Sequence, residues 1–317
     1  MEEIVLIRVF IDKVDITDSL SIRDVSYVDY ARGKVDLLEI NLINTDKDWE
    51  KWGLKIDQEI EAIYSSDIGE YSTKTMFVDD FRVVSGGFKI FAKSISLNSK
   101  TNTTRVWENV TLDTIFNDIA SQYGFIYESY ETQSYVYSRV EQHENDFSLL
   151  NKLAEREGYS IKIFDKRIIL FDDKLFESKD PPRTIKRDEI LGDFDVNTKQ
   201  NNKYSKLIIN SSYGKIEEVV ESIIGGTKEL YEEDIYLSSI GEGQRFAKNL
   251  LYKINQDYQS ITLKIDGDVS IAAGNTVNIE GFEEYDGKYF IGENRVQLDS
   301  NFFMLLTLRR VVNGNNG

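Results

Sequence analysis

Short runs of β-branched and aromatic residues alternate with turn-forming residues through the first 104 positions of the chain. Runs of this length, with side chains pointing alternately to two faces, are typical of β-strands. A hairpin turn is expected at Ser85-Gly86-Gly87, because glycine tolerates the positive φ that tight turns require. Residues 1–104 are therefore predicted to form a small β-barrel or sandwich. The expected strands are Ile4–Ile11, Ile22–Tyr30, Val35–Leu42, Glu59–Tyr64, Thr75–Val84 and Phe88–Leu97.

The apolar positions change to a helical period in residues 105–183. One helix is expected after Thr111, a good N-cap, and should end at Gly124. A second is expected over Asp146–Glu157, followed by a β-hairpin. This part is predicted to be a small α+β unit. The first helix face consists of Leu112, Ile115, Phe116, Ile119, Ala120 and Tyr123, and the hairpin strands are Tyr159–Phe164 and Ile168–Phe171.

The strand pattern returns after Pro181-Pro182, the only two prolines of the chain, which mark a stiff exposed connection. One helix is expected at Gly243–Asn255. The predicted fold class is thus β-rich α+β, with two β-rich domains at 1–104 and 184–317 and an α+β domain at 105–183. The strands expected after the prolines are Lys206–Asn210, Glu217–Ile224, Glu229–Leu237, Ser260–Ile265, Thr276–Glu280, Lys288–Gln297 and Phe302–Val311.

Composition narrows the possible chemistry. The 317 residues include no cysteine and one histidine, which excludes thiolate sites and multi-histidine metal sites. The acidic start predicts no signal peptide, and no apolar run is long enough for a membrane span. The net charge of −17 argues against gripping nucleic acid through its phosphates. The excess of acidic over basic side chains is evenly spread along the chain. Residues 1–104 have 19 acidic and 13 basic side chains, residues 105–183 have 15 acidic and 10 basic, and residues 184–317 have 21 acidic and 15 basic.

Candidate catalytic groups are few. His143, flanked by Glu141 and Glu144, is a possible general base, but the sequence has no nucleophile motif, so a surface histidine is the favoured interpretation. The other candidates are carboxylate clusters, a stretch similar to part of a calcium loop and a stretch similar to the end of a phosphate loop, and each is better explained as a turn or a solvated face. In that order they are Glu217-Glu218-Glu221, Glu232-Glu233-Asp234 and Glu283-Glu284-Asp286, then Asp266-Gly267-Asp268, then Gly225-Gly226-Thr227-Lys228. Trp49 and Trp52 stay open between a binding edge and a barrel plug. We therefore predict no catalytic residue, no cofactor and no metal site.

Several segments, in order, resemble one family of tail proteins. Residues 142–158 are similar to the stretch Q-x-x-E-x-D-F-x-x-L-x-x-L-A-x-x-x-G of phage late control protein D, which also occurs in the hub part of type VI secretion VgrG spikes. Asn145 stands where that family has Glu or Ser. Residues 265–277 resemble its G-D-P-x-L-x-x-G-x-x-V, with Val269 in place of proline, and Gly287–Ile291 resembles G-x-Y-x-I. The matching positions of the first stretch are Gln142, Asp146, Phe147, Leu150, Leu153, Ala154 and Gly158; Ala247 and Leu251 match the family's A-x-x-x-L helix.

The resemblance covers residues 105 to 311 and implies a structural baseplate hub, not an enzyme. It implies two tube-type β-barrels per chain and a homotrimeric, pseudo-six-fold ring in the tail baseplate of a phage or phage-tail-like bacteriocin. Such a ring would join the hexameric tail tube to a separate trimeric spike and contact other baseplate proteins, after synthesis in the bacterial cytoplasm and with no membrane partner. The alternative is a carbohydrate-binding or cell-wall hydrolase accessory of the tail.

The acidic excess suggests a role in such a ring. Carboxylates from Glu217, Glu218, Glu221 or the Asp79-Asp80 pair would line the lumen. A negative wall repels phosphates and lets DNA pass without specific binding. The competing interpretation places these side chains on the outer, solvated surface.

Overall fold

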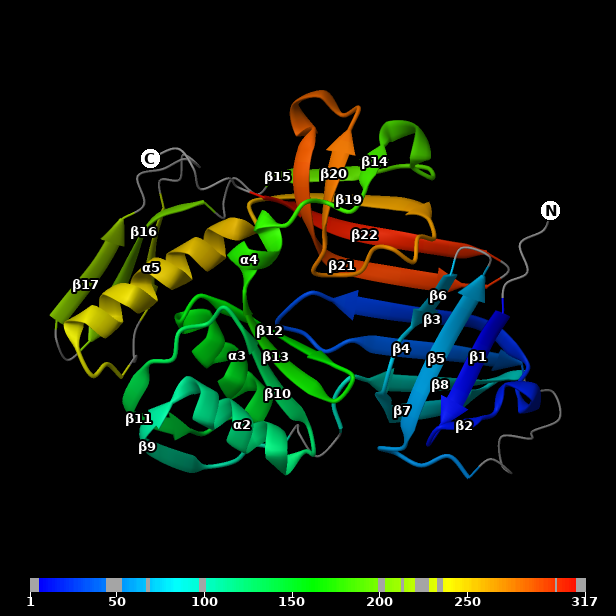
Figure 1. Cartoon of the computed structure of the whole chain (residues 1–317), viewed down its shortest axis with the longest axis horizontal. Helices are drawn as coiled ribbons and strands as arrows, with labels where there is room; N and C mark the ends of the chain where they lie inside the picture. The colour runs from blue at the N-terminus through cyan, green and yellow to red at the C-terminus, as the bar shows by residue number, and fades with distance from the viewer. Residues whose placement is uncertain are drawn as a thin grey trace.

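The computed structural model describes residues 6–43, 53–66, 69–96, 101–198, 203–211, 214–219, 228–232, 236–299 and 301–311. Strands dominate, and the main helices lie together on one side of the molecule (Figure 1). The strands of the large sheet are mostly antiparallel, so the predicted β-rich α+β class is confirmed. Among the described residues, no helix combines the length and apolar character needed to cross a membrane.

One 14-stranded sheet contains strands from both ends of the chain, in the order β15-β19-β22-β21-β3-β4-β8-β7-β5-β1-β2 with β6, β14 and β20 attached. Its N-terminal strands are β1 (Leu6–Ile11), β2 (Val14–Asp15), β3 (Ile22–Tyr30), β4 (Leu37–Ile43), β5 (Glu59–Ser66), β6 (Gly69–Ser72), β7 (Met76–Val84) and β8 (Gly87–Lys93). Its C-terminal strands are β14 (Thr184–Lys186), β15 (Asp195–Thr198), β19 (Gln259–Asp266), β20 (Thr276–Glu280), β21 (Gly287–Leu298) and β22 (Phe302–Arg310).

The two β-rich parts meet where β3 pairs with β21, antiparallel from Tyr30 opposite Glu293 to Val25 opposite Leu298. A single hydrophobic core lies beneath both parts and contains Ile40 from β4 as well as Leu306 from β22. Backbone pairing and a shared core therefore join segments that are more than 250 positions apart in the sequence. Closure of either part into a barrel stays a prediction, as does the division into three domains.

The middle of the chain builds a second core around two helices, α2 (Leu112–Gln122) and α3 (Asp146–Arg156). Thr111 caps α2 as expected, its Oγ1 accepting a hydrogen bond from the Thr114 amide at 3.2 Å, and Gly124 follows the helix with a φ of +67°. The predicted hairpin is also confirmed. Its strands are β12 (Tyr159–Phe164) and β13 (Arg167–Asp172), and the other elements are β9 (Arg105–Thr111), β10 (Ile126–Tyr130), β11 (Val136–Gln142) and the short helix α4 (Asp173–Ser178).

A small sheet and the longest helix complete the second core. The strands are β16 (Tyr204–Ser211), β17 (Gly214–Val219) and β18 (Lys228–Glu232), and the helix is α5 (Ile240–Gln256). Phe246, Ala247 and Leu251 form the buried face of α5 and belong to the same core as α2 and α3. Helix α5 also packs against α3, β16 and β17. Part of the segment 184–317 therefore packs with the middle of the chain and not with the large sheet.

Some elements were not predicted. Strands β9, β10 and β11 and helix α4 lie in stretches without a strong apolar period. Strand β9, for example, buries only Val110. The polar pair Asp79-Asp80 within the expected strand Thr75–Val84 coincides with a shift of register between Val78 and Asp80 inside β7. The bulged Asp79 forms an ion pair with Lys93 of β8 at 2.6 Å. A single extra residue accommodates the polar pair without ending the strand.

Candidate functional site

Asp146, one of the motif residues, is a buried hydrogen-bond acceptor that connects four elements. Its carboxylate accepts from Gln142 Nε2 at 2.6 Å, Tyr123 Oη at 2.7 Å and Thr103 Oγ1 at 3.1 Å, and it pairs with Arg105 at 2.5 Å. These donors lower the pKa of Asp146 below its ordinary value, against the effect of burial. The motif spacing Gln-x-x-x-Asp thus joins the end of β11 to the start of α3.

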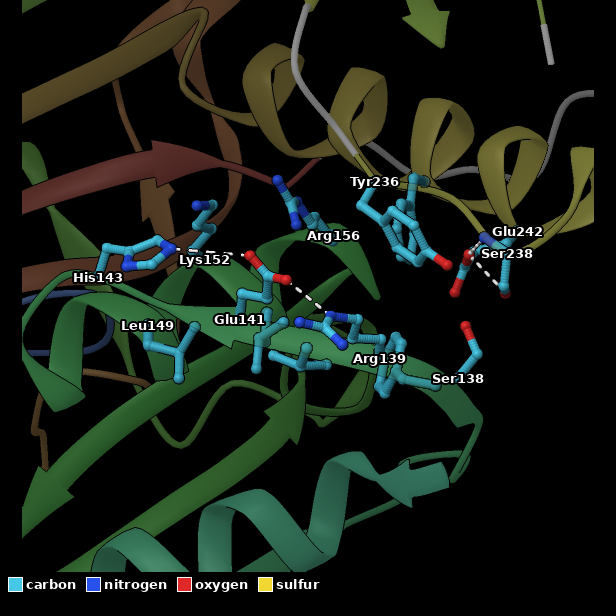
Figure 2. A pocket seen from close by; sticks show the side chains of 14 residues that line it. Ser138, Arg139, Glu141, His143, Leu149, Lys152, Arg156, Tyr236, Ser238 and Glu242 are labelled. Carbon is cyan, nitrogen blue, oxygen red and sulfur yellow. Dashed lines mark hydrogen bonds and ion pairs between the residues drawn. The ribbon is translucent and has the colours of Figure 1, made fainter. Parts of the chain in front are cut away.

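A surface pocket of about 320 Å³ opens next to this motif, where β11, α3 and the beginning of α5 meet (Figure 2). We call it the β11–α5 pocket. Its floor is apolar and consists of the buried side chains of Tyr137, Leu149, Leu153 and Phe246. Its rim is charged. The polar lining residues are Ser138, Arg139, Glu141, His143, Lys152, Arg156, Tyr236, Ser238 and Glu242.

The arrangement in the pocket does not assemble a catalytic triad or dyad. His143 is 70% exposed, and its Nε2 lies 3.7 Å from Glu141. Glu141 in turn pairs with Arg139 at 2.6 Å. Ser138 lies at the opposite end of the pocket from His143 (Figure 2), so the hydroxyl is not placed for activation by the imidazole. The surface interpretation of His143 agrees with this geometry.

Two further hollows of about 450 and 420 Å³ flank the turn between β3 and β4. They share Gly33, Lys34 and Asn151, so the β3–β4 turn and α3 separate them. Lys34 lies 4.8 Å from the ring of Tyr30 in a cation–π contact. The hollow of about 420 Å³ includes Lys253, whose Nζ donates to Ser160 Oγ at 2.7 Å and pairs with Asp173 at 2.8 Å, so this lysine belongs to a buried ionic cluster around Asp173.

Most predicted carboxylate clusters have structural partners within the chain. Glu217 pairs with Lys206 at 2.8 Å and also with Lys215, and Asp80 pairs with Arg82 at 2.8 Å. Asp266 ends β19, and Asp268 beyond it pairs with Arg183 and accepts from the Ser270 amide at 2.8 Å. No group of three or more potential metal ligands occurs among the described residues. Trp49, Trp52, Glu221, Glu233, Asp234 and Gly225-Gly226-Thr227 lie outside the described residues.

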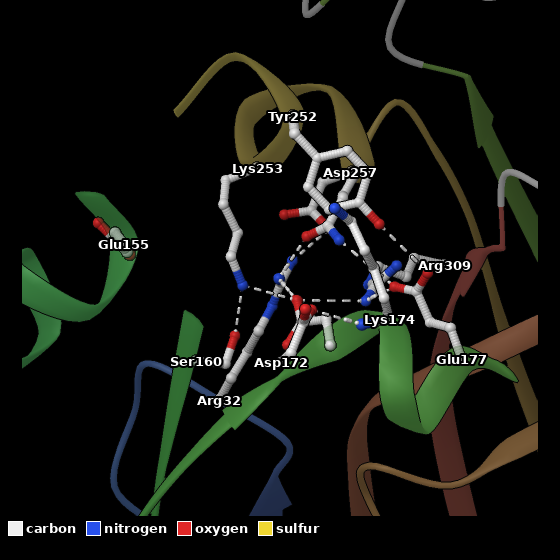
Figure 3. Close-up of polar contacts among 12 residues, drawn as sticks. Arg32, Glu155, Ser160, Asp172, Lys174, Glu177, Tyr252, Lys253, Asp257 and Arg309 are labelled. Atoms are coloured by element: carbon white, nitrogen blue, oxygen red, sulfur yellow. Dashed lines mark hydrogen bonds and ion pairs between the residues drawn. The ribbon is translucent and has the colours of Figure 1, made fainter. Parts of the chain in front are cut away.

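A buried ionic cluster lies where the three segments of the chain meet (Figure 3). We call it the Asp173 cluster. The Asp173 carboxylate, at the start of α4, contacts Lys253 of α5 at 2.8 Å, Arg309 of β22 at 3.6 Å and also Arg32 of the β3–β4 turn. Arg309 pairs in addition with Glu177 at 2.5 Å. Because charges at low dielectric interact strongly, this cluster links the middle of the chain to both β-rich parts.

The charges of the cluster influence one another. Burial and the neighbouring arginines, acting against the attraction of Asp173, lower the pKa of Lys253 to about 8. The three cations hold the pKa of Asp173 well below its ordinary value, although burial acts in the opposite direction. Near neutral pH the carboxylate is therefore ionised and serves as the common counter-ion of the cluster.

A second buried cluster joins β12 to the large sheet. Lys162 donates to the Asp29 carboxylate and to the Tyr30 carbonyl at 2.8 Å, and it lies 3.8 Å from Asp36. Asp36 also accepts from the Tyr27 hydroxyl and from the Tyr30 amide, both at 2.9 Å. Burial, supported by the charge of Asp29 and opposed by Lys162, raises the pKa of Asp36 to about 7.

This raised pKa predicts a pH-dependent stability. An acid whose pKa is higher in the folded state binds more protons there, so its contribution is complete below about pH 4 and is lost as the pH rises through 7. We expect the unfolding free energy of the natural chain to fall between pH 5 and 7.5 relative to that of Asp36→Asn. The difference in slope should approach about 1.4 kcal/mol per pH unit. Urea unfolding at four pH values measures it, and parallel profiles would contradict the assignment.

Sequence reasoning missed both buried clusters. Arg32, Lys162, Asp173 and Arg309 belong to separate elements, and no local motif connects them. The only available signal was a charged residue within an otherwise apolar run, as at Lys162 between Ile161 and Ile163. A charged residue within an apolar run is rarely buried unless a residue of opposite charge pairs with it. Here that residue comes from a distant part of the chain, so the sequence does not identify it.

The fold is that of phage tail proteins. A tail protein from Neisseria meningitidis MC58 superimposes with a TM-score of 0.74 at 11% identity, covering 96% of each chain. The 43 kDa tail protein of prophage MuSo2 from Shewanella oneidensis gives 0.74 at 12% identity, covering 97% of this chain and 98% of the other. At these identities the likeness establishes a shared fold.

A third solved structure comes from a secretion system. The E. coli c3393 protein is described as a component of the type VI secretion system with structural similarity to the T4 bacteriophage tail proteins gp27 and gp5. It gives a TM-score of 0.63 at 10% identity, covering 93% of this chain and 74% of the other. No family model and no curated protein matches the sequence.

Proposed function

We propose that this chain is a structural baseplate hub protein of a contractile injection machine, either a phage tail or a phage-tail-like bacteriocin. The observation that supports this most is the end-to-end likeness to two phage tail proteins, which includes both β-rich parts and the α+β unit between them. The pairing of β3 with β21 adds to it, because a continuous sheet makes the two β-rich parts one stiff body. The chain then acts through its surfaces and not as an enzyme.

In the proposed assembly, three copies form a pseudo-six-fold ring that joins the hexameric tail tube to a separate trimeric spike and contacts other baseplate proteins. Large interfaces of this kind take up apolar side chains that remain exposed on one chain. Val106 of β9, Ile126 of β10 and Val136 of β11 are half or more exposed and are candidates for such contacts. The chain would be made in the bacterial cytoplasm and assembled there into the baseplate of the particle.

DNA passage through the ring lumen without specific binding is part of the proposal. Local ion pairs reduce the negative charge that Glu217, Asp79 and Asp80 would contribute to the lumen wall, because each of them has a basic partner on the same chain. A lumen lined by these residues would therefore carry less net negative charge than the carboxylates alone suggest. Mixed charge still disfavours tight phosphate binding, which requires an uncompensated basic surface.

The ring predicts an oligomeric state. We expect native mass spectrometry to detect a trimer of about 110 kDa, three times the 36.6 kDa chain, either alone or after addition of the spike protein of the same particle. Negative-stain images should then show a three-fold particle with a central hole. A chain that stays monomeric and binds neither tube nor spike protein would contradict the proposal. A glycan array and a peptidoglycan-release assay test the alternative accessory role, for which we expect no signal.

A further inference from the structure

Arg156 differs from the other cations that line the β11–α5 pocket. Arg139 pairs with Glu141 at 2.6 Å and with Glu108 at 3.0 Å, and Lys152 pairs with Glu144 at 3.3 Å. In the part of the chain that the structure describes, the Arg156 guanidinium has neither an ion pair nor a hydrogen bond, and only its backbone carbonyl accepts, from Asn249 Nδ2 at 3.2 Å. Its guanidinium forms a cation–π contact with Phe246, at 5.9 Å from the ring centroid.

The acids near Arg156 are occupied elsewhere or too distant to pair with it. Glu242, in the first turn of α5, accepts from the Ser238 amide at 2.6 Å and from the Ser238 hydroxyl at 2.9 Å. Glu144 pairs with Lys152 and accepts from the His143 amide. Burial lowers the pKa of Arg156, since the longer-range attraction of Glu232 and other acids does not make up for lost hydration. A half-buried cation without a counter-ion is unfavourable, and a carboxylate from outside would correct it.

The shape of the pocket defines what accompanies that carboxylate. The floor is formed by apolar side chains, and Tyr236 stands at the rim with 65% of its surface exposed (Figure 2). A volume of about 320 Å³ is at the small end of ligand pockets, so it suits one or two amino-acid side chains.

We propose that the β11–α5 pocket is a docking site for a peptide segment of another protein, anchored by an Asp or Glu side chain on Arg156 and by a neighbouring aromatic or aliphatic side chain on the apolar floor. An unpaired cation stands out on a chain with a net charge of −17, and it favours an acidic group of the partner at this one place. The inference rests on the proposed function only in taking the partner to be another protein of the particle. Binding of this kind weakens with added salt.

A peptide array tests the proposal with the full-length chain. The probe is an array of random twelve-residue peptides, and the best binders are then measured in solution by fluorescence anisotropy. We expect the natural chain to select peptides in which Asp or Glu adjoins an aromatic or aliphatic residue. Arg156→Gln should weaken these peptides at least tenfold, the size expected for loss of one charge-assisted hydrogen bond. Replacing the peptide acid by its amide should cause a similar loss.

Arg139→Gln is the matched control, because Arg139 lines the same pocket but is already paired with two carboxylates. It should change the affinity less than threefold, and circular dichroism and thermal unfolding should show both variants folded. Selection without acidic residues, equal binding by Arg156→Gln, or N-acetylphenylalanine binding as tightly as the peptides would overturn the proposal. The trimer measurement is made on the same preparations. A monomeric natural chain that still binds acidic peptides through Arg156 would therefore refute the hub and leave the pocket assignment standing.

Discussion

Asp173→Ala is expected to destabilise the chain by about 3–5 kcal/mol, the range observed when one partner of a buried ion pair is removed. The side chain of Asp173 is fully buried, and its partners Lys253 and Arg309 are nearly so. Without the carboxylate, these two cations and Arg32 remain close together without their common counter-ion. Their mutual repulsion at low dielectric adds to the cost of keeping them from water.

Urea unfolding measures this effect, with Asp257→Ala as the control. Asp257 also contacts Arg32, at 3.3 Å, but its side chain is 62% exposed, so a change of less than about 1 kcal/mol is expected. Hydrogen exchange should show the loss of protection concentrated in α4, α5 and the β3–β4 turn, because the cluster links these elements. If Asp173→Ala were no more harmful than Asp257→Ala, the cluster would not hold the segments together.

Asp146→Ala is expected to have the second largest effect, a loss of about 2–4 kcal/mol. Four donors converge on this buried carboxylate, and the buried Gln142 amide would lose one of its two acceptors, keeping only the Glu144 carbonyl at 2.9 Å. Arg105 is partly exposed and can regain water, which reduces the loss relative to Asp173→Ala. The substitution should also loosen β9 and β11, since Arg105 and Gln142 attach this two-stranded ribbon to α3.

The control for Asp146 is Glu141→Ala. Glu141 also pairs with an arginine of the ribbon, at 2.6 Å, but its side chain is 48% exposed. A loss of less than about 1 kcal/mol is expected there. Thermal unfolding followed by circular dichroism compares the two variants, and Asp146→Asn separates charge from shape. Equal losses for Asp146→Ala and Glu141→Ala would show that the motif aspartate has no special structural role.

Local signals were enough to place helices α2, α3 and α5 and most strands. Thr111 and Gly124 delimit α2 because capping and positive φ depend only on the neighbouring backbone. The apolar face of α5, with Phe246 and Leu251, is visible for the same reason. Strands β9 and β11 were missed, since their exposed positions include apolar side chains such as Val106 and Val136, so apolar and polar residues do not alternate with the two faces.

The sequence also indicated which residues of the site segment matter, but not why. Gln142 and Asp146 were notable as motif positions, yet their hydrogen bonds to each other and to Tyr123 appear only when α2, α3 and β11 are packed. Arg156 carried no signal at all, because an arginine in the last turn of a helix is ordinary. That it lacks a carboxylate partner can be known only from the positions of the surrounding acids.

By itself, the sequence determined the periodic elements, the lack of cysteine and the acidic balance, because each depends on residues close in the chain or on simple counts. The tertiary structure alone decided that β3 pairs with β21, that α5 packs with the middle of the chain, and that Arg32, Asp173 and Arg309 share one cluster. Pairings over such distances depend on which surfaces exclude water together, and the local pattern does not specify the partner.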